Sequence, residues 1–81
     1  MVEVNLWSGL RQHTDGKLVV SVEAKTIGEM LDALVRAHPG LGPVFEAGVS
    51  VAVDGEVVAA RRDVAVSPES DVYLMQRIKG G

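Results

Sequence analysis

Apolar and polar residues alternate in two short runs near the start of the chain. Residues 1–6 place their valines and Leu6 on one side and polar residues on the other, and residues 17–22 repeat the pattern. A period of two is typical of β-strands with one buried face. Asp15-Gly16 supplies turn chemistry between the runs. The pattern therefore predicts an antiparallel hairpin.

A helical pattern follows the hairpin. Thr26 and Glu29 have the spacing of a capping box, in which each side chain satisfies a free backbone amide of the first turn. Apolar residues then recur every three or four positions, and Pro39-Gly40 ends the pattern. We predict a helix over about residues 27–38. The glycine- and proline-rich residues 39–48 predict a loop with at most one short turn.

The second half of the chain returns to strand patterns. Residues 49–53 alternate, Asp54-Gly55 forms a turn, residues 56–58 begin a short return strand, and residues 71–76 form the last strand. One helix covers only one face of a sheet, so the order predicts an α+β fold. We expect a ubiquitin-like β-grasp, with a mixed four- or five-stranded sheet packed on one helix and the first and last strands central. The expected core comprises Val2, Val4, Leu6, Leu18, Val20, Ile27, Leu31, Leu34, Val51, Val53, Val72 and Leu74.

Composition narrows the function. The 81 residues predict one domain, residues 1–81, and valine fills fifteen positions, which favours sheet. A net charge of −3 argues against nucleic acid as a partner, since phosphates attract basic faces. The absence of cysteine excludes disulfides, thiolate metal sites and cysteine nucleophiles. No apolar run has membrane-spanning length and no signal-peptide pattern begins the chain, so we expect a cytoplasmic protein with no membrane partner.

The C-terminus is the most informative segment. Residues 77–81 (Arg-Ile-Lys-Gly-Gly) follow the last strand directly, and two glycines contribute no side chain to a core. We expect a flexible arm that ends in the α-carboxylate of Gly81. Five extended residues reach about 17 Å, enough to enter another protein's active site. This segment is named the C-terminal arm below.

Several short motifs, in this order along nearly the whole chain, resemble a known family. They are Leu10-Arg11, Leu31-Asp32-Ala33-Leu34, His38-Pro39-Gly40-Leu41, Val51-Ala52-Val53-Asp54-Gly55-Glu56, Ser70-Asp71-Val72 and Gly80-Gly81. With these motifs the chain resembles the small sulfur-carrier proteins typified by the small subunit of molybdopterin synthase and the thiamine-pathway sulfur carrier. In the fifth motif serine stands where the family usually has glycine.

The resemblance implies a carrier rather than an enzyme, although such a chain can be classed as the small subunit of a sulfurtransferase. An adenylating, E1-like partner would use ATP and magnesium to activate the Gly81 carboxylate. Sulfide or a persulfide would then displace AMP and leave a thiocarboxylate. A sulfur-accepting synthase, with the large subunit of molybdopterin synthase as the favoured candidate, would use that sulfur in cofactor biosynthesis. The chain itself is expected to bind no cofactor and no metal.

One departure from the family keeps an alternative open. Gln76-Arg77-Ile78-Lys79 precedes the diglycine, whereas family members of the molybdopterin type often have small or apolar residues there. The basic and apolar alternation is similar to the tail of ubiquitin, so a protein modifier joined to lysine amines through Gly81 is the alternative. A non-catalytic interaction domain is a third. We expect partners to bind the arm and the second face of the sheet, at Gly80, Lys79, Ile78, Arg77, Met75 and Tyr73.

Other polar residues offer weaker candidate sites. His13 and His38 lack cysteine or carboxylate partners at metal-ligand spacing. Ser8, His13 and Asp15 share one loop without the strand-to-helix elbow of a hydrolase nucleophile, so a catalytic triad is not expected. Arg61-Arg62 is predicted to be a solvated loop rather than a nucleic-acid site, and docking of an acidic partner is a second role left open.

Overall fold

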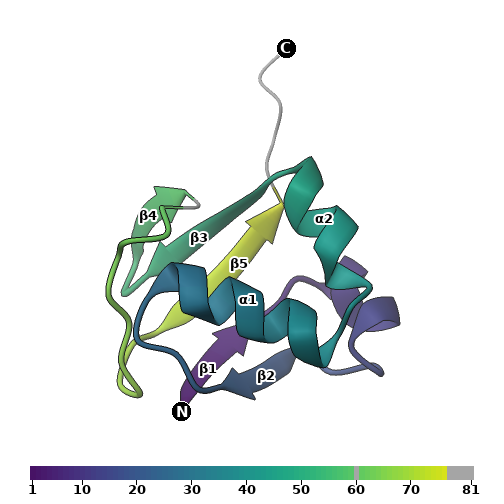
Figure 1. The fold of residues 1–81 in the computed structure, drawn as a ribbon, viewed down its shortest axis with the longest axis horizontal. Coiled ribbons are helices and arrows are strands. Elements are labelled where there is room, and N and C mark those ends of the chain that lie inside the picture. Colours follow the sequence, from purple (N-terminus) through teal and green to yellow (C-terminus); the bar gives the residue numbers. More distant parts are fainter. Residues whose placement is uncertain (60, 77–81) are drawn as a thin grey trace.

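The computed structural model describes residues 1–59 and 61–76, and it confirms the predicted α+β architecture (Figure 1). The described residues form five strands, two α-helices and one 3₁₀-helix. Their order along the chain is β1 (Val2–Asn5), η1 (Ser8–His13), β2 (Val19–Val22), α1 (Ile27–Ala37), α2 (Leu41–Ala47), β3 (Val49–Val53), β4 (Glu56–Ala59) and β5 (Val72–Gln76).

The five strands form one mixed sheet in the order β2-β1-β5-β3-β4. The two end strands of the chain, β1 and β5, lie side by side and parallel, whereas the other neighbours are antiparallel. The predicted hairpin is present, with Val4 opposite Val20. This arrangement confirms the ubiquitin-like β-grasp and the central position of the first and last strands.

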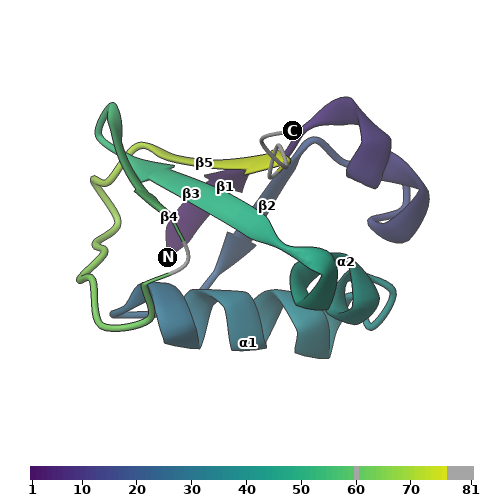
Figure 2. The same ribbon diagram turned by 90° about the horizontal axis from the view of Figure 1, so that it is seen from above.

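Both α-helices lie on the same face of the sheet (Figure 2). α1 presents Ile27, Met30 and Leu34 to the sheet, and none of the three is exposed to solvent. They meet valines and leucines from the strands in one hydrophobic core. Because burial of each such side chain is worth about 1.5–3 kcal/mol, this contact is the main stabilising interaction of the fold.

The start of α1 is capped largely as predicted. The Thr26 hydroxyl accepts a hydrogen bond from the Glu29 backbone N–H at 3.2 Å. The Glu29 carboxylate, however, accepts from the backbone N–H of Lys25 at 3.0 Å rather than from that of Thr26. The helix ends at Ala37, with His38 as its C-cap, close to the predicted end.

Replacing Thr26 with alanine is expected to lower the free energy of unfolding by about 1 kcal/mol, within the usual range for loss of an N-cap side chain. Thr26→Ser keeps the hydroxyl and serves as the matched control, with little change expected. Urea denaturation of the three proteins measures the effect. Equal stability of the alanine and serine variants would show that the cap contributes nothing.

The prediction of a loop over residues 39–48 is wrong, and so is the prediction of a single helix. Residues Leu41–Ala47 form α2. Pro43 lies in the first turn of this helix, where a missing N–H breaks no intrahelical hydrogen bond. Leu41 is fully buried and anchors the helix in the core. Glycine and proline thus mark the ends of a short helix here.

The expected core also needs correction at Leu18. Its side chain is 44% exposed, because β2 begins one residue later, at Val19. Val53 is only partly buried. Core positions that the prediction missed include Leu10, from η1, and Met30 and Leu41, from the two helices. The alternation of the second strand is real, but Leu18 lies at its end. The Leu18 carbonyl oxygen still accepts a hydrogen bond from the Leu6 backbone N–H at 2.8 Å, whereas the side chain is exposed.

The Asp54-Gly55 turn has the predicted hairpin geometry. Both residues have positive φ, 52° and 84°, as a type I′ turn requires. The Asp54 carboxylate accepts a hydrogen bond from the backbone N–H of Asp71 at 2.9 Å. The turn therefore also fixes the start of β5, the strand that leads to the C-terminal arm.

Candidate functional site

The residues expected to carry the chemistry follow the end of β5. Gly81, Gly80, Lys79, Ile78 and Arg77 lie outside the described residues. The strand before them is well placed: β5 pairs with β1 on one side and with β3 on the other, and Gln76 lies opposite Val49. The arm thus begins at one end of the central strand of the sheet.

The two other predicted partner-binding residues lie on β5 itself. Val72 and Leu74 point into the core, whereas Tyr73 is 48% exposed and Met75 is half-buried. Tyr73 and Met75 alternate along the strand with the core-facing residues Val72 and Leu74, so both belong to the face away from the helices. The structure therefore brings them together, as predicted.

The strand register extends this surface across the whole sheet. Asn5 of β1 lies opposite Tyr73 of β5, and Tyr73 lies opposite Ala52 of β3. The same row continues to Val19 of β2 at one edge and to Val57 of β4 at the other. These five residues are named the open-face band.

The open-face band is mainly apolar. Val57 is 62% exposed and Val19 is 46% exposed. Asn5 is the polar member, and its side-chain amide donates to the carbonyl oxygen of Val72 at 2.9 Å. Burying exposed apolar surface yields about 25 cal/mol per Å², and tyrosine is a frequent anchor of protein interfaces. The band is suited to binding another protein.

Sequence reasoning missed Val19 and Val57. Each valine is next to a core-facing residue in its strand and therefore points to the other face of the sheet. This alternation is the feature of the sequence that could have indicated them. Their alignment with Tyr73 depends on the strand register. A β-bulge between β3 and β4 shifts that register between Val51 and Ala52, so it cannot be obtained from alternation alone.

The two histidines occupy separate structural positions. His13 ends η1 and packs against Gly40, where a Cβ atom would come within 2.7 Å of the His13 Nδ1 atom. His38 is the C-cap of α1. Among the described residues, no three histidine, aspartate or glutamate side chains gather where they could hold a metal ion.

The remaining polar candidates have structural roles. Ser8 and His13 lie in η1, and no hydrogen bond between the side chains of Ser8, His13 and Asp15 is seen in the described part of the chain. Arg62 lies in an exposed loop, as predicted, and its guanidinium also donates to the Asp32 carboxylate at 2.7 Å and to the Gly28 carbonyl oxygen at 3.3 Å. Within residues 1–59 and 61–76, no helix has the length and apolar character needed to cross a membrane.

Three solved structures show how the fold compares with known proteins. Mycobacterium tuberculosis CysO superposes with a TM-score of 0.82 at 20% identity, over 96% of this chain and 100% of that one. A chain of the Amycolatopsis orientalis BexX/CysO complex gives 0.79 at 22% identity, with 100% of both chains covered. SAMP1 from Haloferax volcanii gives 0.70 at 29% identity, over 99% and 98% of the two chains. No curated protein matches the chain.

The sequence comparison identifies the family of the chain, which the similarity in fold does not. The model of the ThiS family matches residues 4–81, which is nearly the whole chain and includes both terminal glycines. The match spans the sheet, the open-face band and the C-terminal arm. The chain belongs to the ThiS family of ubiquitin-like β-grasp sulfur carriers.

Proposed function

We propose that this chain carries sulfur as a thiocarboxylate on Gly81 and donates it in cofactor biosynthesis, with molybdopterin as the favoured product. The family match through residue 81 is the observation that carries the proposal, because it includes the reacting end as well as the fold. The open-face band supports it, since a carrier must bind the enzymes that load and unload it.

The proposed chemistry has two steps, both catalysed by partners. A carboxylate oxygen of Gly81 attacks the α-phosphate of ATP, and pyrophosphate leaves. Sulfide then attacks the acyl-adenylate carbonyl, AMP leaves, and the C-terminus is a thiocarboxylate. A persulfide donor attacks in the same way and gives an acyl disulfide. One further step follows in that case, in which a thiol of the partner cleaves the S–S bond, forms a disulfide with the donor and releases the thiocarboxylate. The adenylating, E1-like partner binds ATP and magnesium. The reaction takes place in the cytoplasm, where ATP is available. This chain contributes the carboxylate and the docking surface.

The geometry of the sheet suits this division of labour. The open-face band and the start of the arm share β5, so a partner that binds the band has the arm beside it. Five extended residues reach about 17 Å. A partner can therefore bind the folded body through Tyr73 and Met75 and still place Gly81 in a buried active site.

Exchange of labelled pyrophosphate into ATP tests the proposal. A candidate adenylating enzyme is incubated with ATP, magnesium and labelled pyrophosphate, with and without this chain. We expect exchange only when the chain is present, because formation of the acyl-adenylate is reversible. Failure with every adenylating enzyme of the source organism would contradict the proposal.

Changing Tyr73 to aspartate is expected to weaken binding of the adenylating partner by roughly tenfold or more, the scale of losing one interface anchor. The added charge would have to be desolvated at the centre of the band. Ala65→Asp is the matched control, because it adds the same charge at an exposed position outside the band. Calorimetry or surface plasmon resonance measures the affinity. Equal binding by the two variants would place the docking surface elsewhere.

A protein modifier is the second candidate. It is favoured by the basic residues Arg77 and Lys79, and by the similarity to H. volcanii small archaeal modifier protein 1, which is 26% identical over 95% of this chain. A modifier would appear in cell extracts as conjugates of increased mass that disappear when Gly81 is deleted. A sulfur carrier would appear in the extracts as the unconjugated protein. The binding activity of an interaction domain would require neither Gly80 nor Gly81.

A further inference from the structure

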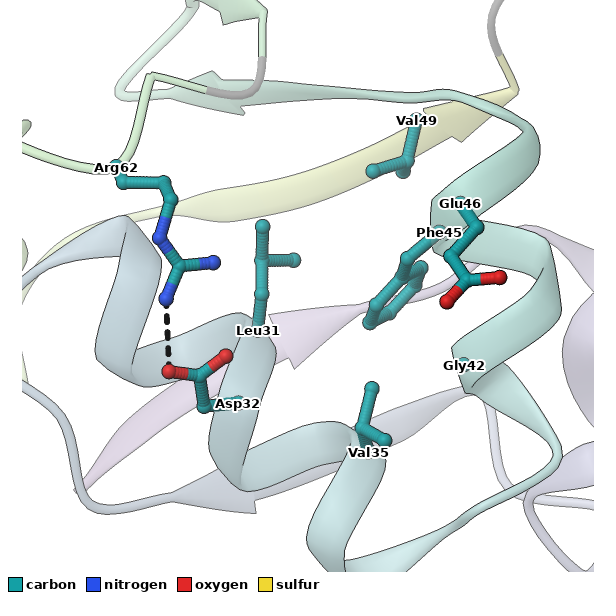
Figure 3. Close-up of a pocket in the computed structure, with 8 residues that line it drawn as sticks. All are labelled: Leu31, Asp32, Val35, Gly42, Phe45, Glu46, Val49 and Arg62. Carbon is teal, nitrogen blue, oxygen red and sulfur yellow. Dashed lines mark hydrogen bonds and ion pairs between the residues drawn. The ribbon is translucent and has the colours of Figure 1, made fainter.

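A groove lies between α1 and α2 (Figure 3). Both helices lie on one face of the sheet, so the groove is on the side opposite to the open-face band (Figure 2). Its volume is about 500 Å³, within the range of binding sites in proteins. Leu31 and Val35 of α1, Phe45 of α2 and Val49 of β3 give it an apolar floor. This cavity is named the helix groove.

The rim of the helix groove is acidic. Asp32 and Glu46 both line it, and Arg62 pairs with Asp32. Gly28 lets Arg62 lie close to α1, since a Cβ atom there would come within 3.0 Å of the Arg62 Cβ atom. Arg62 therefore lies beside Asp32 on one side of the groove. The Glu46 side chain is exposed on the other side (Figure 3).

A second depression adjoins the helix groove and extends the acidic surface. Glu23 and Glu29 line it together with Asp32, and Arg36 is its basic residue. Over the two depressions, four carboxylates therefore face two guanidinium groups. A segment with an apolar side chain flanked by basic ones has the complementary chemistry.

The chain contains such a segment directly after β5 in the sequence. Residues 77–79 are Arg-Ile-Lys, and they follow Gln76, whose register partner Val49 lines the groove. Neighbouring strands are about 5 Å apart. Ile78 is the apolar residue of this segment, and the basic residues Arg77 and Lys79 flank it in the sequence.

From this complementarity we propose that the helix groove binds the C-terminal arm of the same chain. Ile78 covers Phe45 and Val49, while Arg77 and Lys79 approach the carboxylates of Asp32 and Glu46. The bound arm holds Gly81 against the carrier, and a partner on the opposite face of the sheet must draw it out. The proposal that the arm binds the groove depends only on the chemistry of the groove and of the arm. Its effect on activation rests on the proposed function.

A spin label on the arm tests the contact directly. The chain has no cysteine, so Gly80→Cys provides a single attachment site for a nitroxide. Paramagnetic broadening of side-chain NMR signals is then measured in the full-length protein. We expect loss of intensity at Val35, Phe45 and Val49, with Val19 and Val57 of the open-face band retaining theirs. Ile78→Asp in the labelled protein should restore the groove signals, whereas Ile78→Val should not.

Three results with the spin-labelled protein alone would overturn the inference. They are intact groove signals, broadening that is equal on the two faces, and groove broadening that Ile78→Asp leaves unchanged. A second sample mixes two proteins: one carries the spin label but no NMR isotope, and the other carries the isotope but no spin label. Broadening in this mixture reports only contacts between copies. A contact within one chain gives no groove broadening in that mixture. If the groove signals broaden there as well, the occupant is the arm of a second copy and the proposal for the same chain fails.

Different experiments test the contact between arm and groove and the proposed carrier function. Glu46→Lys should release the arm, seen as recovered NMR signals, whether or not the protein carries sulfur. If the carrier function is also correct, the same variant should lower the KM for the carrier in pyrophosphate exchange. Groove broadening without any exchange would leave the contact standing and remove the function.

Discussion

Deleting Gly81 is expected to abolish carrier-dependent pyrophosphate exchange while leaving the melting temperature unchanged. The deletion removes the carboxylate that the family resemblance assigns to adenylation and leaves another carboxylate, that of Gly80, one residue short. A shift of one residue is about 3.5 Å, too far for in-line attack on a phosphate held by the partner. Glycine has no side chain that could pack in the core, so its removal should leave the melting temperature unchanged.

Gly80→Ala keeps the length of the arm and tests its shape. A Cβ atom restricts the backbone angles and widens the arm. We expect exchange to fall by about 10²-fold, the scale for misplacing a reacting group by roughly 1 Å. The melting curve of each variant is the control for folding. Full exchange by the Gly81 deletion would contradict both the carrier and the modifier, and would leave only the interaction domain.

Changing Leu34 to alanine is expected to lower the free energy of unfolding by about 2–5 kcal/mol. The Leu34 side chain has no exposed surface and lies where α1 meets the sheet. Small domains are stable by only about 5–15 kcal/mol, so this one truncation removes a large share of the total. Urea denaturation, with a check that the slope is unchanged, measures the loss.

Leu18→Ala is the matched control for Leu34. It removes the same atoms from a side chain that is 44% exposed, although alternation alone assigned it to the core. We expect a change of at most about 0.5 kcal/mol, as for most surface substitutions. Equal losses at the two positions would show that β2 begins earlier and that Leu18 is a core residue after all.

The parts of the fold that sequence patterns predicted are those with an unbroken period. β1, β3 and β5 alternate cleanly, and α1 has a cap, an apolar stripe and a Pro-Gly stop. α2 escaped prediction because its seven residues contain both glycine and proline, and because it is held by the packing of buried Leu41 and partly buried Val44 and Phe45 against the core. Tertiary packing decided this segment, against its local preferences.

The same distinction applies to the candidate sites. Tyr73 and Met75 were predictable, because alternation in a single strand assigns them to the face opposite Val72 and Leu74. Val19 and Val57 join them only through the pairing of five strands, which includes a bulge. The helix groove was beyond prediction for a related reason, since α2 forms one of its walls.

The mass of the protein isolated from its own cells tests sulfur carriage most directly. Rapid purification without reducing agents, followed by mass spectrometry of the intact chain and of its C-terminal peptide, locates any modification. The account predicts a fraction in which one oxygen of the Gly81 carboxylate is replaced by sulfur. Depletion of the adenylating partner should remove this fraction. A peptide that always ends in an unmodified carboxylate, when sulfur supply and partner are both present, would contradict the account.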